Sequence, residues 1–78
     1  MSWIIQDNKL VKEFRFKNFE EAFAFMQKVA IVAEKLNHHP NWYNSYNYLR
    51  IELSTHDKGN IITEKDYQLA KEIDNIML

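Results

Sequence analysis

The chain has 78 residues, 46% of them hydrophobic, and a formal net charge of −1. This composition supports one hydrophobic core, so we expect a single domain over residues 1–78. A charge so close to zero gives no broad attraction to nucleic acid, and no apolar run approaches the ~20 residues of a membrane span. We therefore expect neither partner, and because the first residues do not resemble a secretion signal, we expect a cytoplasmic protein.

The first 17 residues predict a β-hairpin. Residues 3–5 are a short apolar strand candidate, and the polar residues 7–9 suit a turn. Residues 10–17 alternate, with Phe14 and Phe16 on one side and Glu13 and Arg15 on the other. This period is typical of a strand with one buried face.

From residue 19 the hydrophobic period becomes helical, and the helix should end near Asn37, a residue type that tolerates a left-handed terminus. Phe25 and Val32 fall off the expected stripe, where they form either a partner-facing patch or a partly buried edge. The stripe expected to face a sheet comprises Phe19, Ala22, Met26, Val29, Ala33 and Leu36, widened by Phe23 and Ala30.

The second half of the chain predicts two more strands and a helix. Residues 42–46 and 48–54 are strand candidates, and in the latter Leu49, Ile51 and Leu53 should face the core. A helix over residues 64–77 should begin at Thr63, with Asp66 as its capping-box partner. The order β-β-α-β-β-α predicts an α+β fold, a four-stranded antiparallel sheet with two helices on one face.

All three histidines lie at the ends of predicted elements. His38 and His39 follow the first helix, and His56 follows the last strand. Imidazole gives and takes protons near neutral pH, so histidines around one pocket could act as acid and base. They could instead be solvated loop residues. A zinc site is less favoured, because adjacent His38 and His39 project in different directions and His56 is distant in sequence.

Two carboxylates and two hydroxyls lie close to these histidines in the predicted elements. Glu34 precedes His38 by one helical turn, so it either orients that imidazole or forms an ordinary surface pair. The capping box fully explains Asp66. Ser54 and Thr55 are either plain strand-end residues or hydroxyl donors for a polar heterocycle.

The pattern resembles the pterin-4a-carbinolamine dehydratase family, also known as dimerisation cofactors of a homeodomain transcription factor. That family's motif has an acidic or similar residue, three further positions, His, then His or Asn, then Pro, followed by an aromatic residue, a second His and finally an Asp. The resemblance covers essentially the whole chain. Many relatives begin with an additional helix, and animal enzymes have Asp where this chain has Asn37. The matching positions here are Glu34, His38, His39, Pro40, Trp42, Tyr46, residues 54–57, Gly59 and Asp66.

The resemblance implies a hydro-lyase that converts 4a-hydroxytetrahydrobiopterin to quinonoid dihydropterin without a cofactor or metal. It implies that the pterin lies between residues 37–39 and residues 54–57. His39 and His56 would exchange protons with the substrate, and His38 would bind and polarise it. The other expected binding residues are Asn37, Ser54, Thr55 and Asp57, supported by Glu34, Pro40, Trp42 and Asp66.

The resemblance also implies partners. Family members form homodimers by joining sheets edge to edge, and homotetramers by helix packing. Cysteine is absent, so association also suits a small chain that no disulfide can stabilise. The pterin would be recycled for an aromatic amino acid hydroxylase. Two alternatives remain: a protein-binding dimerisation module without turnover, and a dehydratase-like protein of molybdenum cofactor metabolism.

Overall fold

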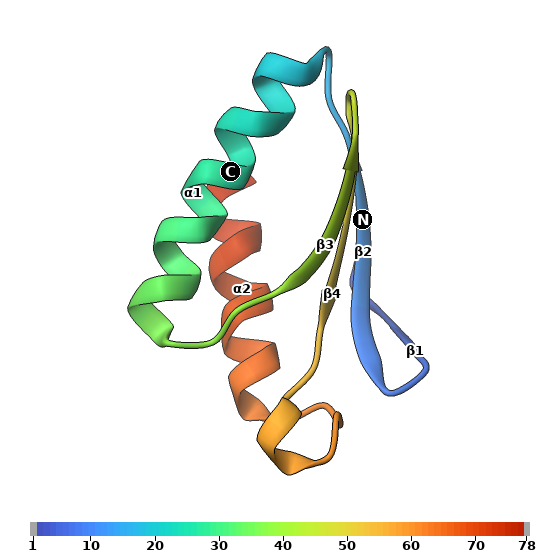
Figure 1. Ribbon diagram of the computed structural model, residues 1–78, viewed down its shortest axis with the longest axis vertical. Helices are drawn as coiled ribbons and strands as arrows, with labels where there is room; N and C mark the ends of the chain where they lie inside the picture. The colour runs from blue at the N-terminus through green and yellow to red at the C-terminus, as the bar shows by residue number, and fades with distance from the viewer. Residues whose placement is uncertain (1, 78) are drawn as a thin grey trace.

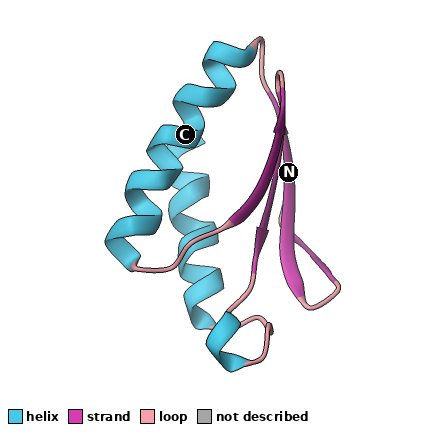
Figure 2. Cartoon of the chain, in the orientation of Figure 1, coloured by secondary structure: helices cyan, strands magenta, loops and turns pink. Residues whose placement is uncertain are grey.

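The computed structural model describes residues 2–77 and has the predicted α+β architecture. Its sheet is antiparallel with strand order β1-β2-β4-β3, and both helices cover one face of it (Figures 1 and 2). This arrangement confirms the expected order of elements and their two layers. The elements are β1 (Ile4–Gln6), β2 (Lys9–Arg15), α1 (Phe19–Leu36), β3 (Asn41–Ser45), β4 (Tyr48–Leu53), the 3-10 turn η1 (His56–Lys58) and α2 (Glu64–Met77).

Two tight turns set the register of the sheet, one at residues 7–8 and one at residues 46–47, where Tyr46 has φ 53°. Asp7 and Asn8 both adopt positive φ, 52° and 61°, as the two-residue turn between β1 and β2 requires. The observed strands differ from the predicted ranges by one or two residues, because pairing begins at the turn and not at the first apolar residue. Trp3 thus lies outside β1, and its indole nitrogen donates a hydrogen bond to Asp74 of α2.

Capping fixes both ends of α1. The side chain of Asn18 accepts a hydrogen bond from the backbone N–H of Glu21. At the other end Asn37 is left-handed, with φ 52°, and its N–H donates to the carbonyl of Glu34. The next N–H, from His38, donates to the carbonyl of Ala33, which completes a Schellman motif. The prediction that the helix ends near Asn37 is confirmed.

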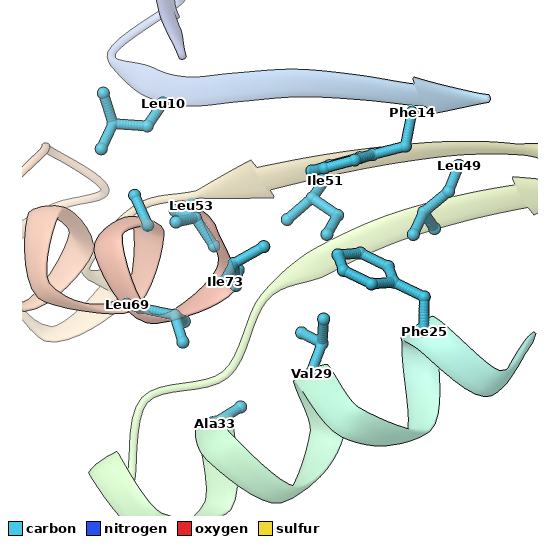
Figure 3. Close-up of a cluster of buried hydrophobic side chains, with 11 residues drawn as sticks. Leu10, Phe14, Phe25, Val29, Ala33, Leu49, Ile51, Leu53, Leu69 and Ile73 are labelled. Atoms are coloured by element: carbon cyan, nitrogen blue, oxygen red, sulfur yellow. The ribbon is translucent and has the colours of Figure 1, made fainter. Parts of the chain in front are cut away.

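The buried face of α1 is rotated from the predicted one. Phe19 and Phe23 are 48% and 47% exposed, and Ala30 is also exposed, so their assignment to the core was wrong. Phe25, predicted to lie off the stripe, is instead buried between the helix and the sheet (Figure 3). A helical period defines a stripe but not which of its flanks the sheet covers. The buried residues of this helix are Ala22, Phe25, Val29 and Ala33.

The core fills the space between the helices and the sheet (Figure 3). Leu49, Ile51 and Leu53 of β4 point into it, as predicted, and none of the three is measurably exposed. Leu69 and Ile73 of α2 meet them from the other side. None of the helices formed by residues 2–77 is both long and apolar enough to cross a membrane.

Candidate functional site

Two segments distant in the sequence meet at the end of the molecule where α2 begins. One is the α1–β3 connection, and the other follows β4 into η1 (Figure 1). Between them lies a cleft of about 370 Å³. Its lining residues are Asn37, His38, His39, Pro40, Asn41, His56, Asp57 and Lys65. All three histidines therefore border one cavity.

His38 is the buried histidine of the cleft. Its Nε2 lies 2.5 Å from Oδ1 of Asp66, and only 10% of its side chain is exposed. The left-handed Asn37 reverses the chain immediately before it, so that its ring turns toward α2. Glu34 is therefore not the partner of His38, and the helical spacing that suggested this pair fails because the helix ends at Leu36.

Asp66 does more than cap a helix. Its Oδ2 accepts hydrogen bonds from the backbone N–H of Thr63 and the hydroxyl of Thr55, each at 2.8 Å. The first bond is the expected half of the capping box. However, Oδ1 bonds His38 and the side chain is fully buried, so capping alone does not explain this residue. The Thr63 hydroxyl bonds Thr55 at 2.6 Å.

His39 lies at the open side of the cleft. Its Nε2 is 2.8 Å from Oε1 of Glu34, and both side chains are exposed, at 57% and 81%. An exposed pair of this kind contributes at most about 1 kcal/mol to stability. Glu34 thus orients an imidazole, but that of His39 and not that of His38. The exposed ring of His39 is in contact with water, with which it can exchange protons.

His56 enters the cleft from the opposite segment, as the first residue of η1. Its Nδ1 lies 2.7 Å from the side-chain oxygen of Asn60. An amide oxygen only accepts, so Nδ1 is the donor in this contact. The tight turn that returns Asn60 toward His56 relies on Gly59, whose φ is 84°.

Five of the predicted site residues do not line the cleft: Glu34 and Asp66, which bond its histidines, and Ser54, Thr55 and Trp42. Ser54 and Thr55 are 3% and 2% exposed, and the Thr55 hydroxyl bonds Asp66 and Thr63 behind His38. Trp42 lies on β3 and borders a separate recess over the sheet. Asn41 and Lys65 do line the histidine cleft, and the sequence did not predict either of them. The position of Lys65 directly before Asp66 was the one available signal.

A larger cavity, of about 660 Å³, lies elsewhere, between β2 and the end of α2. Its lining includes Lys12, Phe14, Asp74 and Met77 but no histidine. Acid–base chemistry near neutral pH therefore points to the smaller cleft. Within residues 2–77, no three or more histidine, aspartate or glutamate side chains are grouped so that they could hold a metal ion.

Comparison with protein families gives one match over nearly the whole chain. The family described as Pterin 4 alpha carbinolamine dehydratase matches residues 1–76. A Prochlorococcus marinus (strain NATL2A) protein, provisionally named a pterin-4-alpha-carbinolamine dehydratase, is 54% identical over 97% of this chain and 79% of its own length. A Solibacter usitatus protein with the same provisional name is 49% identical over 94% of this chain and 76% of its own length.

Solved structures that share the fold include the following two. A Brucella melitensis protein described as a transcriptional coactivator/pterin dehydratase has a TM-score of 0.90 and 40% identity, over 96% of this chain and 81% of its own. A pterin dehydratase-like protein, described as a RuBisCO assembly factor in the alpha-carboxysome, has a TM-score of 0.81 and 26% identity. The match covers 97% of this chain and 89% of the neighbour's own chain. The first description names a pterin dehydratase and the second a protein like one.

Proposed function

Because the chain belongs to the pterin-4a-carbinolamine dehydratase family, we propose that it dehydrates 4a-hydroxytetrahydrobiopterin to quinonoid dihydropterin in its histidine cleft. The C4a–oxygen bond breaks and N5 loses its proton. The hydroxyl group and this proton leave as water, and a C4a–N5 double bond forms. The observation that carries the proposal is that His38, His39 and His56, from two separate segments, border one cavity.

The reaction needs an acid for the departing hydroxyl and a base for the N5 proton. We assign these roles to His39 and His56, because both rings are exposed and can return to their starting protonation state through water. Each such transfer contributes roughly 10²–10⁴-fold to a rate. His38, held by Asp66, binds and polarises the substrate. The elimination is redox-neutral, so proton transfer by side chains is sufficient chemistry.

The surroundings of the cleft suit a flat, polar heterocycle. Asn37, Asn41, Asp57 and Lys65 supply hydrogen-bonding groups around the three imidazoles. A pterin presents ring nitrogens, an amino group and a carbonyl to such groups. In this proposal the protein acts in the cytoplasm as a homodimer or homotetramer and recycles pterin for an aromatic amino acid hydroxylase.

Turnover measurements on purified protein test the assignment. His39→Ala and His56→Ala should each lower the dehydration rate at least tenfold while the circular dichroism spectrum stays that of the wild type. Lys28→Ala, on α1 and outside the cleft, is the matched control and should keep the wild-type rate. Full activity in both histidine variants would refute the assignment.

A binding function without turnover is the second candidate, and one surface favours it. Phe19 and Phe23 stack with ring centroids 5.8 Å apart on the outer face of α1, and Ile31, also exposed, lies further along the helix. Exposed apolar patches of this kind often mark protein interfaces. The descriptions of the two structural neighbours name a coactivator and an assembly factor. Stoichiometric binding of a protein partner with no measurable pterin turnover would favour this candidate.

A further inference from the structure

A directed chain of hydrogen bonds lies behind the cleft. Thr55 has one hydroxyl proton, which it donates to Asp66 at 2.8 Å. The 2.6 Å contact between the hydroxyls of Thr55 and Thr63 must then use the proton of Thr63. The donors therefore run in one direction, from Thr63 through Thr55 to Asp66. The backbone N–H of Thr63 adds a further bond to the same carboxylate oxygen.

This series of hydrogen bonds determines which nitrogen of His38 carries a proton. Oδ2 of Asp66 already accepts two hydrogen bonds, and with Oδ1 as the acceptor in its 2.5 Å contact with Nε2 of His38 the hydrogen lies on Nε2. No residue of the described range 2–77 bonds Nδ1, yet none of the buried side-chain nitrogen or oxygen atoms in that range lacks a partner. Nδ1 therefore keeps some exposed surface, and because His38 lines the cleft, Nδ1 is the ring nitrogen available to a ligand there.

We propose that Thr55 and Asp66 are positioning residues, which hold His38 with its proton on Nε2 so that Nδ1 accepts a hydrogen bond from the bound ligand. Asp66 is fully buried and Thr55 is 2% exposed, so both act through His38 and neither touches the ligand. The identity of that ligand as a pterin carbinolamine rests on the proposed function, but the state of the imidazole does not.

The arrangement gives Thr55 a role different from that of a substrate contact. Its hydroxyl occupies Oδ2 of Asp66, which keeps the carboxylate from rotating away from His38. Small displacements of a catalytic group can cost about 10²-fold in rate. Removal of this hydroxyl should therefore slow turnover, because a displaced His38 no longer polarises the substrate from the right position.

Nitrogen-15 NMR of the ligand-free protein tests the first part. We expect His38 to show a protonated Nε2, an unprotonated Nδ1, and a downfield Nε2–H proton that exchanges slowly with water. In Asp66→Asn this proton signal should disappear. An unprotonated Nε2 in the wild type, or an unchanged signal in Asp66→Asn, would overturn the proposal without any turnover being measured.

The Thr55 variants test the second part. Thr55→Val, close in shape but without the hydroxyl, should lower kcat about tenfold or more and speed exchange of the Nε2–H proton. Thr55→Ser restores the hydroxyl and should restore both values. The positioning role is wrong if Thr55→Val keeps the wild-type kcat and exchange rate, or if Thr55→Ser restores neither of them. A His38 signal that responds as expected in a protein without pterin turnover would sustain this inference while the proposed function fails.

Discussion

Two phenylalanines on α1 provide a matched test of which helix face meets the sheet. Phe25 is 6% exposed, and its ring centroid lies 5.1 Å from that of Phe14 and 5.3 Å from that of Phe16. Phe23, two residues earlier, is 47% exposed, and among the aromatic rings of residues 2–77 it stacks on that of Phe19 alone. Truncation of each to alanine removes the same atoms from the same helix, so the difference reports burial alone.

The expected difference is large on the scale of the whole fold. Truncation of a buried phenylalanine costs about 3–5 kcal/mol, whereas an exposed one costs about 0.5 kcal/mol. A domain of this size has about 4–12 kcal/mol of stability in total. Phe25→Ala should therefore remove at least about a quarter of the stability of the fold.

Urea denaturation followed by circular dichroism measures both variants. With a slope of about 1–2 kcal/mol per molar urea, Phe25→Ala should lower the midpoint by about 2 M or more and Phe23→Ala by less than about 0.5 M. The measurement should be repeated at several protein concentrations, because Phe23 would also matter if its face joins two copies. Equal, concentration-independent losses would refute the helix orientation described above.

Three smaller predictions follow from single contacts. Asn37→Ala should lower the unfolding free energy by about 1 kcal/mol in urea titrations, because alanine is strained at φ 52°; Asn37→Gly should not. The hydrogen bond from Arg50 lowers the pKa of Glu52 below its ordinary value of 4.5. The stability that this shift contributes is therefore present above pH 4.5 and is lost as the pH falls through the lower pKa of Glu52 in the folded protein. Urea midpoints from about pH 5 to pH 3 should consequently fall less steeply in Glu52→Gln than in the wild type, and equal slopes would contradict this. Lys65→Met should raise KM for the carbinolamine about threefold or more with kcat nearly unchanged, whereas Lys71→Met, on the same helix outside the cleft, should change neither.

The sequence predicted those features that depend on neighbouring residues. Alternation in β4 gave the inward Leu49, Ile51 and Leu53, and the left-handed preference of asparagine gave the end of α1 at Asn37. The α+β order followed from these local elements because few arrangements bury such faces together. The family was identified from its spaced motif and is confirmed by the match over residues 1–76.

What the sequence did not predict depends on contacts between distant segments. The pairing of Glu34 with His38 assumed helical geometry beyond Leu36, whereas the chain reverses there and brings His39 to Glu34 instead. The true partner of His38 is Asp66, 28 residues away, and no local period links the two. Phe25 was misplaced for a related reason, since the flank of a helix that the sheet covers is decided by the tertiary fold.

The central claim is that one ligand is held by imidazoles from two separate segments. A nitrogen-15 NMR titration with 7,8-dihydrobiopterin, a stable pterin that cannot be dehydrated, tests it most directly. We predict that amide signals of residues 37–41 and of His56 and Asp57 shift together, with one common dissociation constant. Shifts confined to one of these segments, or centred on Lys12 and Asp74 at the larger cavity, would contradict the claim.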